Sequence, residues 1–331
     1  MPNFAKTTVP RPRLVLTLDD FQPVPSPYQG AYLAVGNFDG VHRGHLHLLA
    51  RLKANADAAG APSIALTFDP SPAAVLRPDA APPSLTWPER RFALIRATGV
   101  SEVAVFRTGR WLLGLTARAF FDRVIREQFR ARGMVEGPTF GFGRDRGGDA
   151  AVLATWCAAA ALDFEVAEPI DIGGRIVSSS RVRRLIAEGD VREATKLLGR
   201  PHRLRGTVVR GAGRGRGIGT PTANLSGVDV LVPADGVYAG LARTDSTETP
   251  VAAAVHIGPN VTFGATARTV EAHLIDFEGD LYGQSVELDF LERIRPTAKF
   301  ESVAALIEQM RRDVDQARMI AHAASLPSRP S

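Results

Sequence analysis

Three of the seven histidines of the chain lie within six residues, in the stretch AVGNFDGVHRGHLHLL at 34–49. A glycine-rich turn follows a strand-like run here, and a helix is predicted to start near Gly44. His42 and His45 would then lie at a helix N-terminus, where free backbone N–H groups and the helix dipole favour anions. The pair is therefore predicted to bind phosphate. A metal site, with Asp39 as the third ligand, and a purely structural role are the alternatives.

A serine run, VSSSRVR at 177–183, comes at the start of a later predicted helix. Serine hydroxyls accept hydrogen bonds from the free N–H groups of a helix start, so these serines are predicted to cap it. Either Arg181 or Arg183 can supply positive charge to a triphosphate. Two such anion-binding helix starts in one segment favour a domain that transfers a nucleotide. If the attacking group is itself a phosphate anion, this chemistry requires no general base.

A glycine-rich stretch, RGTVVRGAGRGRGIGTPTANL at 205–225, lets the backbone approach a ligand closely. Thr222 and Asn224 follow it with hydroxyl and amide oxygens, which Mg²⁺ prefers beside substrate phosphates. Glu271 lies in a later predicted strand, where alternation puts it on the opposite face from both its neighbours. An arginine–glycine patch that binds RNA is the alternative for the loop, and a surface glutamate is the alternative for Glu271.

The first half of the chain alternates strands and helices, which predicts a Rossmann-like parallel sheet with helices on both faces. The predicted strands are 31–35, 63–68, 102–106 and 163–168. Helical patterns lie between them, and three glycines fall where helices should end: Gly60, Gly99 and Gly133.

The second half changes character, because strand-like runs bounded by turns follow one another from Leu204 onward. This pattern predicts an antiparallel β-barrel, preceded by two short helices within 178–204. The final helical pattern is amphipathic, with an apolar face made of Val303, Leu306, Ile307, Met310 and Val314. We therefore predict two domains of different class, at 15–189 and 190–322.

The bulk properties narrow the class of protein. No apolar run is long enough for a membrane helix, and the N-terminus has no secretory signal pattern. The single cysteine, Cys157, is expected to be a buried helical thiol, and a cytoplasmic location is expected. The net charge of +5 is spread among acidic residues, so we expect polyphosphate ligands and no nucleic-acid or membrane partner. Oligomerisation stays open.

Together these motifs resemble the bacterial bifunctional riboflavin kinase/FAD synthetase family from about residue 15 to 318. The second half is similar to the riboflavin kinase module through GxVxxGxxRGRxxGxPTANL, DGVYA and TVEAHLxDFxGDLYG. The resemblance implies that Thr222 and Asn224 bind Mg²⁺ and that Glu271 is the general base toward riboflavin. It also implies that the glycine-rich loop wraps ATP or flavin, through Gly211, Gly213, Arg216, Gly217, Gly219, Thr220 and Pro221.

The first half resembles the nucleotidylyltransferase superfamily through G-x-F-D-x-x-H-x-G-H and a variant of I-S-S-T-x-x-R. The resemblance implies that this domain converts FMN and ATP to FAD. ATP and its phosphates are then predicted to contact Gly36, Phe38, Asp39, His42, Gly44, His45, Ser178, Ser179, Ser180 and Arg181.

Three positions depart from the family pattern: Ser71 replaces a histidine, Thr139 replaces an Asp or Asn, and His256 replaces the asparagine of A-N-I-G. The first two departures lie in the nucleotidylyltransferase half. The alternative function is therefore a riboflavin kinase whose first domain is weakened or non-catalytic.

Overall fold

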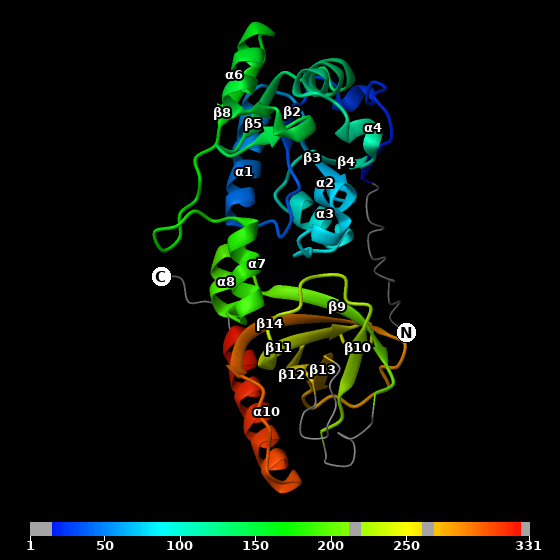
Figure 1. Ribbon diagram of the computed structural model, residues 1–331, viewed down its shortest axis with the longest axis vertical. Coiled ribbons are helices and arrows are strands. Elements are labelled where there is room, and N and C mark those ends of the chain that lie inside the picture. Colours follow the sequence, from blue (N-terminus) through cyan, green and yellow to red (C-terminus); the bar gives the residue numbers. More distant parts are fainter. Residues whose placement is uncertain (1–14, 212–219, 260–267, 326–331) are drawn as a thin grey trace, which may run out of the picture. The chain divides into compact units, whose positions relative to one another are not determined.

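The structure is a computed structural model that describes residues 15–211, 220–259 and 268–325. They form two compact units (Figure 1). The first contains the described residues of 1–38, 45–82 and 88–169, and the second contains those of 39–44, 83–87 and 170–331. Within the described ranges, no helix has the length and apolar character needed to cross a bilayer. The boundaries of the functional domains, 15–189 and 190–322, stay a prediction, because a division into compact units does not show where one function ends and the other begins.

The first unit is built on a parallel sheet in the order β1-β4-β3-β2-β5-β8. Four of its strands were predicted: β2 (Tyr32–Val35), β3 (Ser63–Asp69), β4 (Glu102–Arg107) and β8 (Asp163–Val166). Two were not: the short edge strand β1 (Leu16–Leu18) and β5 (Gly133–Glu136). The chain leaves β2 toward β3 on one side and later adds β5 on its other side, so the topological switch point lies between β2 and β5.

The helices of this unit follow the predicted patterns. They are α1 (Arg43–Ala58), α3 (Pro88–Arg96), α5 (Ala117–Phe120) continuing into the π-helical η3 (Phe121–Gln128), and α6 (Ala150–Ala159). Gly60 and Gly99 follow helix ends with positive φ, as predicted. Gly133 does not end a helix. It starts β5, where a Cβ atom would lie 2.4 Å from the Tyr32 ring, so close packing requires the glycine.

Shorter elements complete the first unit. These are η1 (Ser26–Tyr28), α2 (Pro72–Leu76), η2 (Pro78–Ala80), α4 (Arg110–Leu113), β6 (Gly141–Phe142), η4 (Arg144–Arg146) and β7 (Gly148–Asp149).

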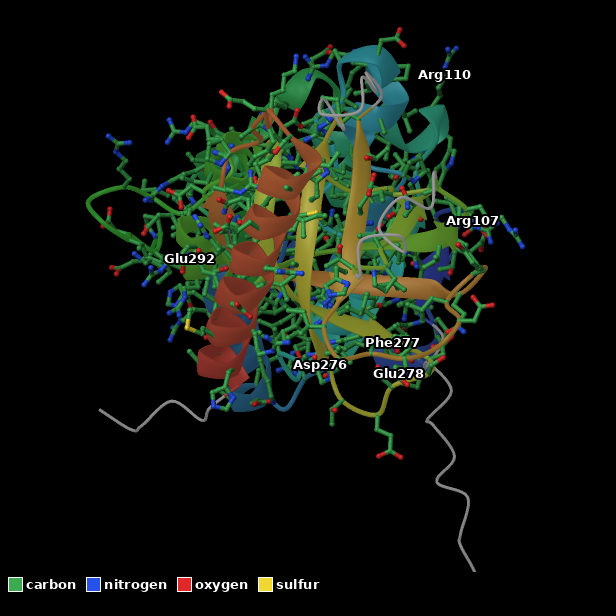
Figure 2. The ribbon with its side chains drawn as sticks, turned by 90° about the horizontal axis from the view of Figure 1, so that it is seen from below. Arg107, Arg110, Asp276, Phe277, Glu278 and Glu292 are labelled. Carbon is green, nitrogen blue, oxygen red and sulfur yellow. The ribbon has the colours of Figure 1, made fainter. Side chains whose placement is uncertain are left out.

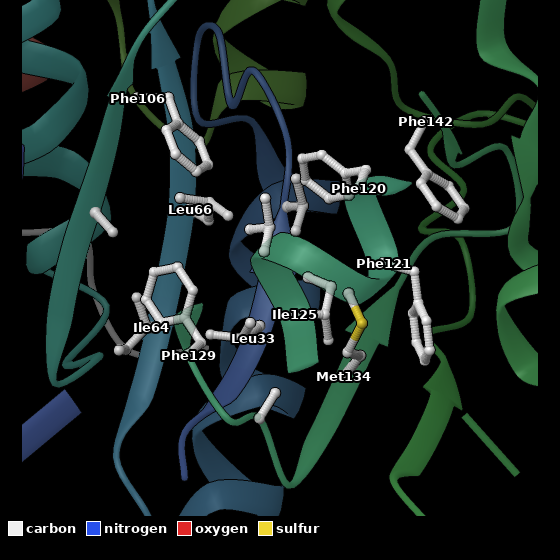
Figure 3. Packing of buried hydrophobic residues seen from close by; sticks show 14 of the residues in the cluster. Leu33, Ile64, Leu66, Phe106, Phe120, Phe121, Ile125, Phe129, Met134 and Phe142 are labelled. Carbon is white, nitrogen blue, oxygen red and sulfur yellow. The ribbon is translucent and has the colours of Figure 1, made fainter. Parts of the chain in front are cut away.

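The main core of the first unit joins sheet residues to the α5–η3 helix (Figure 3). Leu33, Leu66 and Phe106 from the sheet pack with Phe121 and other apolar residues of this helix. Cys157 on α6 is fully buried in the same cluster, which confirms the prediction of a buried helical thiol. The core fixes the central strands, whose carboxyl ends form one edge of the sheet.

The second unit contains two short helices and a closed antiparallel barrel, as predicted. The strand order around the barrel is β10-β13-β12-β11-β14-β9. The helices are α7 (Ser179–Glu188) and α8 (Val191–Leu198). The strands are β9 (His202–Val209), β10 (Ala223–Ser226), β11 (Gly236–Thr244), β12 (Val251–Gly258), β13 (Thr269–Leu274) and β14 (Ser285–Arg295). Thr222 directly precedes β10, and Asn224 lies within it.

The last helix, α10 (Val303–Ser325), packs on the outside of the barrel against β11, β12 and β14. Val314, Ala317 and Ile320 make this contact, in a cluster with Ala239 and Ile275. Four residues of the predicted apolar face are partly buried, namely Leu306, Ile307, Met310 and Val314. Its first residue, Val303, is 50% exposed.

Candidate functional site

The outer face of the barrel brings together several of the residues predicted for the kinase site. Asn224 on β10 is the register partner of Glu271 on β13, and Glu271 is the partner of His256 on β12. Val270 and Ala272 are buried in the barrel core while Glu271 is half-buried, which confirms that Glu271 lies on the opposite face from its neighbours. Three adjacent strands therefore present Asn224, Glu271 and His256 in one row.

Hydrogen bonds orient the Glu271 carboxylate from two sides. The Thr269 hydroxyl donates to Oε1 at 3.1 Å, and the Thr222 hydroxyl lies 3.4 Å from Oε2. Gly211 packs against Asn224 so closely that a Cβ atom there would lie 2.3 Å from Asn224 Nδ2. The two predicted metal ligands, the predicted base and the first glycine of the loop are thus neighbours.

The donor set suits Mg²⁺, because Thr222, Asn224 and Glu271 bring hydroxyl, amide and carboxylate oxygens to one place. Close by in sequence, the Thr220 hydroxyl is buried and has no hydrogen-bond partner among the described residues. A buried polar atom without a partner is costly unless a ligand or ion satisfies it. Gly213, Arg216, Gly217 and Gly219 lie outside the described residues.

His256 lies in a mixed electrostatic environment. Burial lowers the pKa of its imidazole, and the negative charge of Glu271 partly opposes that shift. Arg295 also lowers the pKa, whereas Asp235 and Asp313 raise it. The ring is therefore neutral near pH 7 and adds no positive charge beside the Glu271 carboxylate.

A pocket of about 80 Å³ opens beside Thr222, and its walls combine polar and apolar surface in similar amounts. Its walls come from β9, β10 and β13 and from the turn after β13, where Figure 2 labels Asp276, Phe277 and Glu278. Phe277 and Tyr282 supply aromatic rings, and the Arg210 guanidinium lies 5.4 Å from the Tyr282 ring centre. Sequence reasoning missed this pocket. Its signal in the sequence is the segment DFEGDLYG at 276–283, which contains both aromatic residues.

In the first unit, the glycine-rich turn leaves the sheet directly from β2. The Gly36 N–H donates to Leu66 O at 3.0 Å. A Cβ atom on Gly36 would lie 3.3 Å from the Phe38 ring, so that ring covers the glycine. Phe38 in turn contacts the His45 ring edge-to-face, with centroids 5.3 Å apart. Gly36, Phe38 and His45 therefore lie together at the end of β2 and the first turn of α1.

In the second unit, Asp39 is enclosed by donors. Its carboxylate accepts hydrogen bonds from the backbone N–H groups of Leu85 and Thr86 and from the Thr86 hydroxyl, all at 2.9–3.1 Å. The Arg183 guanidinium completes the set at 2.6 Å. Asp39 is 7% exposed. A carboxylate satisfied in this way anchors the loop, whereas contact with a phosphate would add repulsion between like charges.

His42 is 5% exposed, and burial lowers the pKa of its imidazole to about 4. The ring is therefore neutral near pH 7 and can contribute hydrogen bonds but no positive charge. Gly44 packs against it, because a Cβ atom there would lie 3.2 Å from His42 Cε1. Arg200 stabilises the loop by donating to the Val41 carbonyl at 2.9 Å and to the Gly40 carbonyl.

Of the three serines predicted to cap α7, Ser178 is the cap. The Ser178 hydroxyl accepts from the Arg181 N–H at 3.3 Å, and the Ser179 hydroxyl donates to the Asp39 carbonyl at 2.9 Å. Ser180 is exposed in the first turn. The two arginines separate: the Arg181 guanidinium donates to the carbonyls of Ile172 and Arg175, whereas Arg183 forms the ion pair with Asp39.

Among the residues in the described ranges, no group of three or more His, Cys, Asp or Glu side chains is arranged to bind a metal.

Residues 24–181 match the FAD synthetase family, and residues 198–321 match the riboflavin kinase family. A bifunctional riboflavin kinase/FMN adenylyltransferase from Pseudomonas fluorescens is 35% identical over 89% of this chain and 94% of its own length. The chain belongs to this bifunctional family.

Other relatives agree with this assignment. The bifunctional enzyme of Escherichia coli K12 is 33% identical over 88% of this chain and 93% of its own length. A crystal structure described as a macrolide-efflux protein from Streptococcus pneumoniae has a TM-score of 0.82 and 31% identity, covering 92% of this chain and 98% of that one. The name macrolide-efflux protein belongs to the Streptococcus protein, and what this chain shares with it is the similarity of fold and sequence.

The two departures from the family pattern in the first unit differ in what their side chains do. Ser71 caps α2, because its hydroxyl accepts from the Ala74 N–H at 3.3 Å. Thr139 is exposed, and its carbonyl accepts from Arg146 at 3.1 Å. Neither position disturbs the sheet that supports the glycine-rich turn.

Proposed function

We propose that this chain phosphorylates riboflavin to FMN and adenylylates FMN to FAD, with ATP as the donor in both reactions. The observation that supports this best is the row of Asn224 and Glu271 beside Thr222 on the barrel, in a chain whose two halves match the two enzyme families. The match of both halves favours two activities over riboflavin kinase alone.

In the kinase reaction, Glu271 accepts the proton of the ribityl 5′-hydroxyl as that oxygen attacks the γ-phosphorus of ATP and ADP leaves. A neutral alcohol is a weak nucleophile, so a positioned carboxylate raises the rate. Thr269 and Thr222 keep this carboxylate aimed away from the barrel core. The neutral ring of His256 beside it leaves its negative charge uncompensated on that side.

The nucleotide is proposed to bind with its purine in the pocket lined by Phe277 and Tyr282 and its phosphates toward Thr222. Aromatic walls suit a flat base, and the hydroxyl of Thr222 lies on the side where the glycine-rich loop joins β10. Thr222 and Asn224 would hold Mg²⁺, which neutralises charge on the transferring phosphates. Gly211 permits this arrangement by leaving room for the Asn224 side chain.

In the adenylylation reaction, the FMN phosphate attacks the α-phosphorus of ATP and pyrophosphate leaves. The attacking group is already an anion, so binding in line and charge stabilisation account for the chemistry. His42 and His45 are proposed to donate hydrogen bonds to phosphate oxygens at the start of α1. The ion pair of Asp39 with Arg183 holds the loop at 39–44 in place.

Two incubations of the purified chain test the proposal. With riboflavin, ATP and Mg²⁺, FMN and then FAD should accumulate. With FMN, ATP and Mg²⁺, FAD and pyrophosphate should form in equal amounts. FMN formation without any FAD or pyrophosphate would support the kinase-only alternative, and the absence of both products would refute the proposal.

The paired variant His42→Ala/His45→Ala separates the two sites. We expect it to lower FAD formation from FMN at least tenfold, on the order of one or two lost charge-assisted hydrogen bonds. FMN formation from riboflavin should not change. An equal fall in both rates would show that the two sites are not independent.

A further inference from the structure

Glu136 is a buried acid at the switch point of the first unit. It is the last residue of β5, and β5 pairs with β2 where the strand order reverses. In open α/β sheets, ligands bind outside the carboxyl ends of the strands at this point. Gly36, the first residue of the nucleotide-binding turn, directly follows β2.

The Glu136 side chain replaces a backbone acceptor between the two strands. The register of β2 and β5 ends at Leu33 opposite Met134. Two residues further, the Val35 N–H donates to Glu136 Oε1 at 2.7 Å. On the other side of β2, the Gly36 N–H donates to Leu66 O at 3.0 Å. Two consecutive N–H groups at the end of β2 are thus held from opposite sides, that of Val35 by the Glu136 carboxyl group of β5 and that of Gly36 by the backbone of β3.

The surroundings of this carboxyl are apolar. Glu136 is 1% exposed, and within the described part of the chain it forms no ion pair. Its register partner on β8 is Val166, and two residues before it Met134 packs with Ile125 (Figure 3). The titratable group that faces it is Cys157 on α6, whose pKa is raised to about 11 by burial and by Glu136.

Burial also raises the pKa of Glu136 well above its usual range, and the hydrogen bond from Val35 only partly opposes that shift. The thiol of Cys157 stays protonated and adds no charge to this environment. A carboxyl without a cation in such surroundings is neutral in the folded protein.

We propose that Glu136 is a positioning residue of the adenylyl site that acts as a neutral acid. Its carbonyl oxygen accepts the Val35 N–H and so fixes the peptide from which the Gly36 turn starts, and its ionisation opposes the binding of the ATP polyphosphate. This inference rests on the proposed adenylylation. A negative charge fixed under a crevice that binds a polyanion is repulsive, and little water lies between to screen it.

The experiment compares wild type, Glu136→Gln and Glu136→Ala across a pH series from about 6 to 9, with FAD formation from FMN and ATP as the readout. The glutamine keeps a carbonyl acceptor for Val35 and has no ionisation. Its kcat/KM for ATP should equal that of wild type at the acid end and exceed it increasingly with pH, by up to about tenfold. Glu136→Ala should lower kcat/KM at every pH.

Two controls accompany these variants. Riboflavin phosphorylation by the same chains should stay at the wild-type rate, which shows that the substitutions act on the first unit and leave the second intact. Glu165→Gln is the matched carboxyl control, because Glu165 lies on the adjacent strand β8 and its pKa is lowered, chiefly by a hydrogen bond from Arg51. It should not change the pH profile. A constant ratio of glutamine variant to wild type across the series, or a glutamine variant that is slower throughout, would overturn the inference.

The free energy of unfolding gives a second readout that is independent of activity. The folded pKa of Glu136 lies above its unfolded value, so its contribution to stability is complete below the unfolded pKa and is lost as pH rises toward the folded one. Wild type should lose stability relative to Glu136→Gln with rising pH. Parallel curves would refute the neutral acid, whereas a wild type that forms no FAD at any pH would refute the adenylylation itself.

Discussion

Replacing Asp39 with alanine tests whether this residue anchors the histidine loop or binds phosphate. In the structure its carboxylate accepts the N–H groups of Leu85 and Thr86 and the Thr86 hydroxyl, and it pairs with Arg183. The alanine variant removes all four interactions at once. The loop at 39–44 then loses its connection to the segment at 83–87 and to α7.

The expected loss in the free energy of unfolding follows from the polar groups that Asp39→Ala leaves without a hydrogen-bond partner. Two buried backbone N–H groups lose their acceptor, at about 1–3 kcal/mol each. Arg183 keeps the Pro83 carbonyl as an acceptor at 2.8 Å and is 20% exposed, so its lost ion pair adds less than a fully buried pair would. We expect Asp39→Ala to lower the free energy of unfolding by about 4 kcal/mol. Asp39→Asn keeps one carbonyl acceptor and should cost about half as much.

Urea denaturation followed by circular dichroism gives the free energy of unfolding, and FAD formation from FMN is measured at low temperature, where the variant is folded. Adenylylation should fall at least tenfold while riboflavin phosphorylation is retained. Lys53→Ala is the control, because Lys53 belongs to an exposed i,i+4 pair with Asp57 and should cost less than about 0.5 kcal/mol. The anchoring role is refuted if Asp39→Ala unfolds within about 1 kcal/mol of wild type and loses only ATP affinity.

Three further predictions concern single residues of the two sites. Glu271→Gln should lower FMN formation by about 100-fold or more and leave FAD formation from added FMN unchanged. The control is Glu278→Gln, at an exposed position, which should change neither rate. Wild-type kinase activity of Glu271→Gln would exclude Glu271 as the base. His42 has a folded pKa of about 4, below its unfolded value, so the protein should lose up to about 3 kcal/mol of stability as pH falls from 6.5 toward 4. His42→Gln should remove that loss, and an unchanged acid profile in chemical denaturation would contradict it. Gly211→Ala should displace the Asn224 side chain and raise the Mg²⁺ concentration needed for half-maximal kinase rate, and a wild-type Mg²⁺ titration would show that the close packing is without consequence.

Local patterns determined most of the secondary structure of this protein. Turn-bounded runs rich in β-branched and aromatic residues predicted five of the barrel strands, and helical periodicity predicted the helices of both halves. The elements that were missed are short. β10 has only four residues, and β5 starts with Gly133, a glycine that seemed suited to end a helix. Pairing with neighbours formed these strands, and such pairing has no local signal.

The sequence by itself singled out Thr222, Asn224 and Glu271 as candidates for the kinase site, because hydroxyl and amide oxygens suit Mg²⁺ and because their motifs resemble those of the riboflavin kinase module. What it left undecided is which charged groups are satisfied internally. Asp39 and Arg183 are 144 residues apart, and only the fold shows that they neutralise each other. Arg181 is similarly occupied by carbonyls of the loop before α7.

The three clustered histidines at 42–47 also show which properties the sequence indicates and which the fold decides. Their spacing predicted a helix start, and α1 begins at Arg43. Whether an imidazole there is a cation or a neutral donor depends on its burial, and His42 is neutral because the folded chain encloses it. The same holds for Glu136, which looked like an ordinary residue of a short segment. Residue type sets which protons a group can exchange, whereas tertiary packing removes the water and thereby decides which charge state survives.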